Sequence, residues 1–334
     1  MPLPIIGITM GDPTGIGPEI IVKALSTEEV FRVCRPVVFG DHGVLSMAVR
    51  IQNLSATLEA IDRIPQDGYL PGKIFLFSLT QLEVASLRFG RPDRACGEAM
   101  VRYIEEAVKR AKNRELDAIT TCPINKKAMN EAGYSFPGHT ELLAHLTGAS
   151  SVAMMFLGSK WRIVLVTIHL PLKDVSREVS KARILSILRL TDEGMRKYFA
   201  IPQPKIAVLG LNPHCGEEGL LGDEEKKEIL PAIAEAKLLG MGAEGPFPAD
   251  SFFNGSGSHA FDAVVAMYHD QGLIPVKMLN FKEAVNVTLG LPFVRTSVDH
   301  GTAYDIAGKG LADSTNLVKA ILTAANLWKS RKDY

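Results

Sequence analysis

Short, β-branched apolar runs alternate with amphipathic helical stretches along most of this 334-residue chain. Apolar runs of this kind are typical of strands that are buried on both faces of a parallel sheet. Their alternation with helices predicts an α/β fold. The length predicts about two domains or one large domain. Because no flexible linker or repeat is visible, two lobes would arise by the chain crossing between them.

Periodicity and turn residues predict the individual elements. The helix at 97–115 is the clearest, because its apolar residues form one stripe opposite charged residues. Strands are expected at 5–10, 37–39, 73–77, 117–121 and 286–289, and helices after Pro18 and at 97–115, 141–146, 181–199, 224–240 and 313–330.

Three further apolar runs each lead into a histidine. His169 follows in IVLVTIHLPL, His214 in IAVLGLNPHCGE and His269 in AVVAMYHDQG. Each histidine is expected where a strand ends, which is where open α/β sheets place ligand sites. Three imidazoles at one sheet edge can hold a divalent metal and leave coordination positions for a substrate. The alternative is that each is an ordinary histidine in a capped loop.

The charge balance excludes the simplest electrostatic partners. Lys+Arg 37 equals Asp+Glu 37, so nothing favours nucleic acid or an anionic membrane. No apolar run approaches the roughly 20 residues of a membrane span. The chain opens into a strand without a basic region or cleavage site, so no signal peptide is expected. The four cysteines form no CxxC pair, and reduced thiols in a cytoplasmic protein are their simplest explanation.

A second group of polar residues suits an anion. His139 and Thr140 precede an expected helix and can bind phosphate or carboxylate, although Thr140 could equally be the N-cap of that helix. Lys277, Asn286 and Arg295 follow the third histidine. The planar guanidinium of Arg295, between apolar residues and Thr296, suits bidentate capture of phosphate.

The turn GDPTGIGPEI lacks the Lys-Ser/Thr of a P-loop and the glycine spacing of a Rossmann turn. A glycine-rich turn before a helix still exposes backbone N–H groups to an anion. The alternative is that the glycines supply only a tight bend.

Several motifs together resemble the 4-hydroxythreonine-4-phosphate dehydrogenase family of vitamin B6 synthesis, in register from about Ile5 to Asp313. These motifs are GDPTGIGPE, GHTE, THLPL, NPHCGE, GPFPAD, MYHDQG, VNVTLGLPF and RTSVDHGTA. The first motif, and DHGTAYDIAGKG near the end, also resemble the opening and the cofactor loop of isopropylmalate dehydrogenase.

The resemblance implies an isopropylmalate/isocitrate-dehydrogenase-like α/β fold, with two α/β/α lobes and a cleft between them. The cofactor-side lobe is expected at 1–130 plus 275–334, and the metal, substrate and dimer-interface lobe at 131–274. The resemblance further implies a homodimer with its active site at the subunit interface. One divalent metal is implied per site, for which Zn, Mg, Mn and Co are candidates, and imidazole ligands favour zinc or cobalt over magnesium.

The implied reaction is the NAD(P)-dependent oxidation of 4-hydroxy-L-threonine 4-phosphate to 2-amino-3-oxo-4-(phosphooxy)butanoate, which decarboxylates to 3-amino-2-oxopropyl phosphate. By position, the metal ligands are His169, His214 and His269, and the substrate-binding residues are His139, Thr140, Lys277, Asn286 and Arg295. Residues expected to bind the nucleotide are Gly11, Asp12, Gly15, Gly17, Asp299, His300, Gly301, Thr302 and Asp305.

Proton transfer is assigned to three candidates. Lys277 is one, and Asp250 and Asp270 are expected either to move protons or to orient ligands. A turn-stabilising aspartate is the alternative for Asp270.

Two other functions stay open at this point. Relatives with the same motifs act on D-threonate or D-erythronate 4-phosphate in sugar-acid catabolism, and no residue here identifies the amino group that distinguishes the substrates. A metal-dependent lyase without a nicotinamide is the alternative from another class, and the expected cofactor loop argues against it. The choice between NAD and NADP is also open, because no acidic residue lies at the Rossmann spacing.

Overall fold

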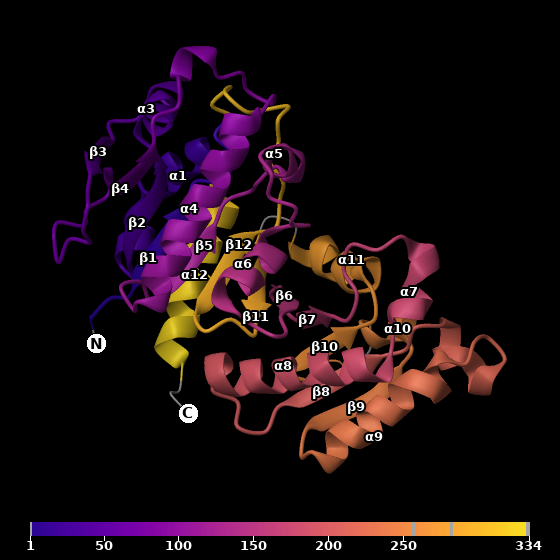
Figure 1. Ribbon diagram of the computed structural model, residues 1–334. Coiled ribbons are helices and arrows are strands. Elements are labelled where there is room, and N and C mark those ends of the chain that lie inside the picture. Colours follow the sequence, from indigo (N-terminus) through magenta and orange to yellow (C-terminus); the bar gives the residue numbers. More distant parts are fainter. Residues whose placement is uncertain (1, 255–257, 259, 281–282, 332–334) are drawn as a thin grey trace. The chain divides into compact units, whose positions relative to one another are not determined.

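A computed structural model describes residues 2–254, 258, 260–280 and 283–331 (Figure 1). The chain divides into two compact units, of which unit 1 is Met1–Ala149 with Leu291–Lys329, and unit 2 is Ser150–Gly290 with Ser330–Tyr334. The boundaries expected at 130/131 and 274/275 therefore lie too early in the chain. They shift because two helices after residue 125 pack against a helix of unit 1, and a strand before Gly290 pairs within unit 2.

Unit 1 is built on a parallel sheet in the order β3-β4-β2-β1-β5-β12. Its strands are β1 (Ile5–Thr9), β2 (Arg35–Asp41), β3 (Thr57–Ala60), β4 (Lys73–Thr80), β5 (Ala118–Thr121) and β12 (Val294–Val298). The central strands are buried throughout, as expected for parallel strands covered on both faces.

Helices of unit 1 follow the strands in the expected alternation. They are α1 (Gly17–Ala24), α2 (Glu28–Phe31), α3 (His42–Ile51), η1 (Val84–Ser86), α4 (Arg94–Lys112), α5 (Lys126–Glu131), α6 (His139–Thr147) and α12 (Thr315–Ser330). Helix α4 begins three residues earlier than predicted because Asp93 caps it, accepting a hydrogen bond from the N–H of Cys96. Its apolar stripe, which includes Met100 and Ile104, is buried.

Unit 2 has a mixed sheet in the order β11-β6-β7-β10-β8-β9. Its strands are β6 (Ala153–Leu157), β7 (Arg162–Leu165), β8 (Lys205–Leu209), β9 (Gly242–Phe247), β10 (Ala263–Ala266) and β11 (Val285–Leu289). Strand β6 runs antiparallel to both β7 and β11, whereas β7, β10, β8 and β9 are parallel. The sequence did not predict β6 or its antiparallel pairing.

The helical segments of unit 2 are α7 (Leu172–Glu178), α8 (Lys181–Phe199), η2 (Pro213–Gly219), η3 (Glu225–Ile229), α9 (Leu230–Leu238), α10 (Ala249–Phe252) and α11 (His269–Asn280). Helix α8 has the predicted bounds. The helix predicted at 224–240 is instead divided into the π-helical turn η3 and the helix α9. Pro231, in the first turn of α9, has no N–H to donate to the preceding turn. The hydrophobic core includes Trp161, Leu209 and Leu273.

None of the described helices is both long and apolar enough to cross a membrane. All four cysteines carry free thiols, and those of Cys34, Cys96 and Cys122 are buried.

A buried carboxylate joins distant parts of unit 1. Glu19 in α1 is 1 % exposed and accepts hydrogen bonds from the N–H groups of Gly308 (2.6 Å) and Gly310 (3.0 Å). It also accepts one from the amide of Gln52 (2.7 Å). The loop that precedes α12 is therefore attached to the first helix of the chain.

Glu19→Ala removes the acceptor for all three donors. Since leaving buried donors unsatisfied is costly, we expect the free energy of unfolding to fall by about 2 kcal/mol or more. Urea unfolding followed by circular dichroism measures this change. Glu29→Ala, at an exposed position of α2, is the matched control and should stay within about 0.5 kcal/mol of wild type. Equal losses in both variants would contradict the anchoring role.

Candidate active site

The three candidate metal ligands follow three neighbouring parallel strands of unit 2. Strands β7, β10 and β8 are adjacent, and His169, His269 and His214 come three to five residues after their respective ends. Because parallel strands share one carboxyl edge, the topology leads the chain to that edge before each of the three histidines.

Two of these imidazoles lie side by side. The ring centroids of His169 and His269 are 5.9 Å apart. Nδ1 of His269 is 2.7 Å from Oδ1 of Asp270, so Nε2 of His269 is the ring nitrogen that does not face this carboxylate. Among the residues that the structure describes, no three His, Cys, Asp or Glu side chains gather closely enough to hold a metal.

His214 lies on a left-handed turn. His214, Cys215, Glu217 and Glu218 all have positive φ between 42° and 57°, and Gly216 has φ 79°. L-residues rarely adopt this conformation, because Cβ then approaches the following carbonyl, and each costs about 1 kcal/mol or more. A run of such residues persists only where its surroundings hold it.

Glu225 holds this turn in place. It is 3 % exposed, and its Oε1 accepts hydrogen bonds from the N–H groups of Leu211 and Asn212, each at 2.8 Å. Its Oε2 accepts from Nδ2 of Asn212 at 2.9 Å. Sequence reasoning missed Glu225, because its place in a charged helical stretch resembles an ordinary solvated position.

Nearby carboxylates raise the pKa of His214. Glu217 accepts a hydrogen bond at 2.6 Å from Nδ1 of His214 and thereby raises the pKa of this imidazole, and Asp250 adds a smaller effect in the same direction. Asp250, in α10, is therefore near enough to His214 to raise the pKa of this imidazole slightly.

Two of the predicted anion-binding residues, His139 and Arg295, lie near each other in unit 1. Arg295 on β12 is 2 % exposed and donates to Oγ1 of Thr121 at 2.7 Å. Burial lowers the pKa of His139, and the positive charges of Arg295 and Lys126 lower it further. The cationic Lys126 was missed, because its neighbourhood to His139 depends on the tertiary fold.

Gly138, and not Thr140, is the N-cap of α6, so the capping alternative for Thr140 is wrong. Thr140 lies inside the first turn and is buried. Lys277, on α11, and Asn286, on β11, belong to unit 2. Oδ1 of Asn286 is buried and has no hydrogen-bond partner among the described residues.

The expected nucleotide-binding segments contact each other in unit 1. The N–H of Ile16 donates to the carbonyl of Thr302 at 3.1 Å, and a Cβ on Gly15 would lie 3.1 Å from Thr302. Oδ2 of Asp12 accepts from the hydroxyl of Tyr304 at 2.5 Å, and burial raises the pKa of Asp12. The turn and the loop therefore form one assembly.

Some of the turn glycines have a structural task. Gly11 has a φ of +71°, and a Cβ built on it would lie 2.3 Å from the carbonyl oxygen of Pro123. A Cβ built on Gly17 would lie 2.2 Å from the carbonyl oxygen of Met10. Gly301 instead has open space around its Cβ position.

The remaining loop residues are fixed by short-range bonds. The N–H of Asp299 donates to Asn316, Nδ1 of His300 is 3.0 Å from the carbonyl oxygen of Gly301, and the carbonyl of Asp305 accepts from Lys309.

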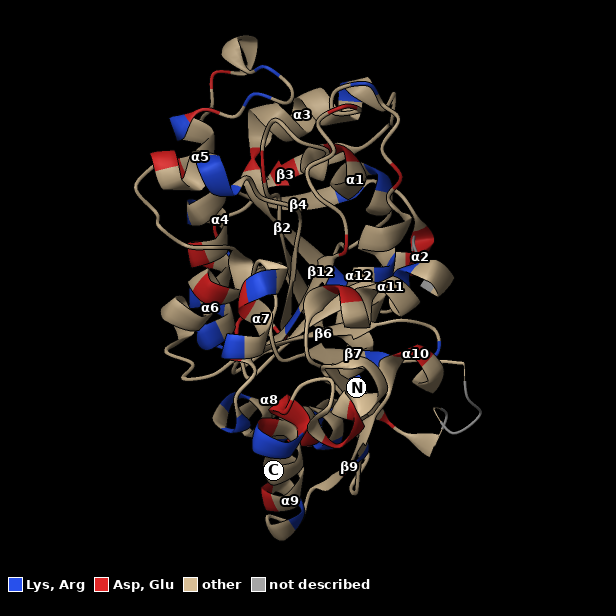
Figure 2. Ribbon diagram, turned by 90° about the vertical axis from the view of Figure 1, so that its right-hand side faces the viewer, with Lys and Arg blue, Asp and Glu red and all other residues tan. Residues whose placement is uncertain are grey.

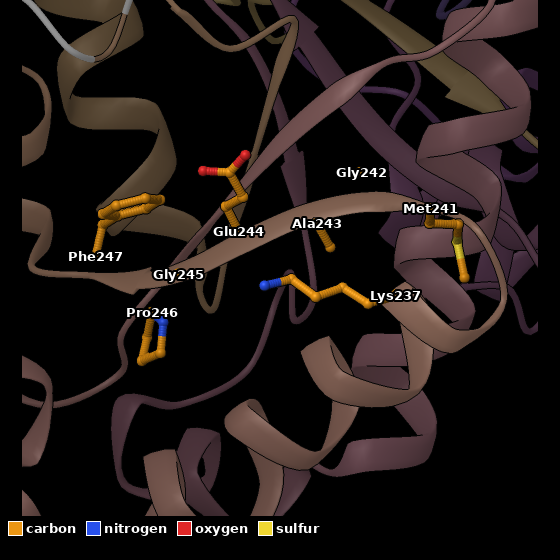
Figure 3. A pocket seen from close by; sticks show the side chains of 8 residues that line it. All are labelled: Lys237, Met241, Gly242, Ala243, Glu244, Gly245, Pro246 and Phe247. Atoms are coloured by element: carbon orange, nitrogen blue, oxygen red, sulfur yellow. The ribbon is translucent and has the colours of Figure 1, made fainter.

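A separate pocket of about 390 Å³ lies along β9 (Figure 3). Lys237 extends from α9 beneath this strand, on which Glu244 and Phe247 also line the pocket. None of the residues predicted for the site lines it. Both basic and acidic residues lie along α8 and α9 (Figure 2).

Comparison with known proteins agrees with the motifs. The family model "Pyridoxal phosphate biosynthetic protein PdxA" matches residues 32–324. A 4-hydroxythreonine-4-phosphate dehydrogenase of Desulforapulum autotrophicum is 50% identical over 96% of this chain and 95% of its own length. A D-threonate 4-phosphate dehydrogenase of Cupriavidus necator is 45% identical over 97% of both chains. The crystal structure of 4-hydroxythreonine-4-phosphate dehydrogenase from Klebsiella pneumoniae superposes with a TM-score of 0.88 at 39% identity, covering 97% of this chain and 99% of that one.

The fold and these relatives define an α/β oxidoreductase that acts on a CH–OH group, with the isopropylmalate-dehydrogenase-like fold expected from the motifs. The chain belongs to the PdxA family, whose similar members include proteins named 4-hydroxythreonine-4-phosphate dehydrogenase and one named D-threonate 4-phosphate dehydrogenase. The resemblance seen in the sequence is confirmed.

Glu225→Ala tests how the His214 turn is held. Three donors lose their buried acceptor and the left-handed residues lose their support, so we expect the free energy of unfolding to fall by about 2 kcal/mol or more. Glu225→Gln keeps one acceptor oxygen and should lose less. Urea unfolding provides the comparison, with limited proteolysis reporting on cleavage within 211–222. Glu235→Ala, whose side chain makes only an exposed ion pair with Lys181, is the control; resistance of the 211–222 segment in Glu225→Ala would refute this role.

Proposed function

We propose that this chain is an NAD(P)-dependent, divalent-metal-dependent dehydrogenase of the cytoplasm. It oxidises 4-hydroxy-L-threonine 4-phosphate to 2-amino-3-oxo-4-(phosphooxy)butanoate, which loses CO2 to give 3-amino-2-oxopropyl phosphate for vitamin B6 synthesis. The observation that carries the proposal is the delivery of three histidines by three adjacent parallel strands, in a chain of this family.

The histidines fit a divalent metal. His269 and His214 each hold Nδ1 against a carboxylate, a common way to fix the tautomer and aim Nε2 at a metal. Asp270 therefore orients His269 directly. A bound divalent metal would supply Lewis-acid activation of the substrate hydroxyl and stabilise the negative charge that develops on decarboxylation.

The chain's own residues supply binding and proton transfer. His139, Thr140 and Arg295 bind the phosphate in this proposal, with Arg295 held rigid by burial and by Thr121. Asn286 meets a polar group of the substrate with its buried Oδ1. Lys277 is half-buried on α11 and, as an uncharged amine, accepts the proton of the substrate hydroxyl. The hydride leaves the carbon that bears this hydroxyl.

The nucleotide fits the assembly of the 11–17 turn and the 299–305 loop. NAD(P)+ would accept the hydride and balance the oxidation. Open space at Gly301, together with backbone N–H groups near the start of α1, suits a nucleotide lying along this loop. Asp12 and Glu19 keep the two segments in register.

A second copy of the chain completes the metal site in this proposal. Leu170 and Leu172 follow His169 in the chain. Ile274, Met278 and Leu279 lie on α11, the helix that begins at His269, and all five side chains are exposed, Leu172 by 74% and Met278 by 80%. Exposed apolar residues of this size beside an incomplete ligand set are typical of an interface. A homodimer would cover them and bring ligands from two subunits together.

D-threonate 4-phosphate is the second candidate substrate, because the Cupriavidus relative that is named for it is 45% identical. D-erythronate 4-phosphate carries the same phosphate and hydroxyl groups as D-threonate 4-phosphate and is therefore a further candidate substrate. The lyase alternative is less well supported, since these relatives are named as dehydrogenases.

We expect purified, metal-loaded protein to reduce NAD+ or NADP+ fastest with 4-hydroxy-L-threonine 4-phosphate. Absorbance at 340 nm measures turnover against D-threonate and D-erythronate 4-phosphates, with and without a chelator. His214→Ala should bind less metal, measured by atomic emission, and lose at least about a hundredfold in rate. Faster turnover of a sugar-acid phosphate would mean that the enzyme acts in sugar-acid catabolism and not in vitamin B6 synthesis. No nucleotide reduction with any substrate would reject the dehydrogenase.

Met278→Lys tests the homodimer. A charge on this face should convert dimer to monomer and remove activity, because the site then lacks its partner ligand. Analytical ultracentrifugation gives the mass of each species. Leu238→Lys changes a residue that is 88% exposed on α9 and should leave the dimer intact. A Met278→Lys protein that stays dimeric would argue against this face.

A further inference from the structure

Lys126 adds a second positive charge beside the anion-binding residues of unit 1. It is the first residue of α5, and its side chain is exposed. Its Cε lies 3.6 Å, and its Nζ 4.0 Å, from where a Cβ on Gly138 would be. Since Gly138 is the N-cap of α6, the ammonium stands at the start of that helix, next to His139.

The start of α6 has no capping side chain at its N-cap, and Oε2 of Glu141 lies 3.4 Å from where a Cβ on Gly138 would be. Gly138 has no side chain to cap the first-turn N–H groups. Nε2 of His139 is buried and lacks a hydrogen-bond partner in the described part of the chain. A buried imidazole nitrogen beside a bare helix N-terminus is a costly arrangement unless a ligand satisfies it.

The charges match a phosphate monoester. Burial and the cations Arg295 and Lys126 lower the pKa of His139, so His139 is a neutral donor at pH 7. The site's positive charge therefore comes from Arg295 on β12 and Lys126 on α5, with Glu141 of α6 facing Arg295. Arg295 and Lys126 supply two positive charges against the one negative charge of Glu141, so the site keeps a net positive charge, which favours a phosphate monoester with between one and two negative charges at this pH.

We propose that Lys126 is a phosphate-binding residue that pairs with Arg295 across the start of α6. This inference rests on the proposed function, since it assigns a further residue to the phosphate of the same substrate.

A chain of hydrogen bonds positions Lys126. Oδ1 of Asn125 caps α5 by accepting from the N–H of Ala128 at 2.8 Å, and its Nδ2 donates to the hydroxyl of Tyr304 at 2.6 Å. Tyr304 in turn donates to Asp12. The residue before Lys126 is thus fixed to the loop expected to bind the nucleotide.

Lys126→Met should weaken the binding of inorganic phosphate to the purified dimer about tenfold or more, as measured by isothermal titration calorimetry. Lys127→Met is the matched control, because Lys127 is the next residue of α5, is 85% exposed and pairs with Glu131. Lys126→Arg should restore much of the affinity. Equal phosphate affinity in Lys126→Met and wild type overturns the proposal.

A second measurement separates binding from a structural role. Removing one of the two cations that oppose protonation should raise the pKa of His139, which NMR titration of its imidazole follows, whereas Lys127→Met should leave it unchanged. A His139 pKa that does not move in Lys126→Met also overturns the proposal.

Arg295→Met separates the role of Lys126 in phosphate binding from the proposed function of the whole protein. If Arg295→Met loses phosphate binding and Lys126→Met keeps it, only the role of Lys126 fails. If the wild type binds no phosphate and reduces no nucleotide, the proposed function fails as well.

Discussion

The buried carboxylate of Glu19 is the interaction on which the site of unit 1 depends. It lies near the N-terminal end of the chain and bonds to backbone N–H groups almost 290 residues later. A carboxylate is stable in the interior of a protein only when its oxygens accept hydrogen bonds, and both oxygens of Glu19 do so. The turn at 11–17 and the loop at 299–310 are therefore held together, and Asp12 and Tyr304 extend the same network to Asn125 and α5.

The sequence predicted features that depend on local pattern. The strand before each histidine, the bounds of α8 and the apolar stripe of α4 all follow from periodicity. The domain boundaries could not be predicted, because they depend on which strand pairs with β6. Lys126 and Glu225 were missed for a related reason: each resembles an ordinary charged helix residue until the fold places it against a buried partner.

Two kinds of preorganisation are combined in this chain. In unit 1, buried residues hold the anion-binding groups rigidly, as Thr121 does for Arg295. In unit 2, carboxylates orient the imidazoles of His214 and His269, while an exposed apolar face surrounds the pair formed by His169 and His269. The first device acts within a single chain. The second makes function depend on self-association in the proposed homodimer, and hence on protein concentration.

The left-handed turn at 214–218 sets the stability of the backbone against the orientation of His214. Glycine at Cys215, Glu217 or Glu218 would relieve backbone strain and favour the folded protein. Glycine at any of these positions would also widen the range of conformations open to His214, and at Glu217 it would remove the carboxylate that orients this imidazole. The side chains of this turn therefore hold His214 in place at a cost in stability.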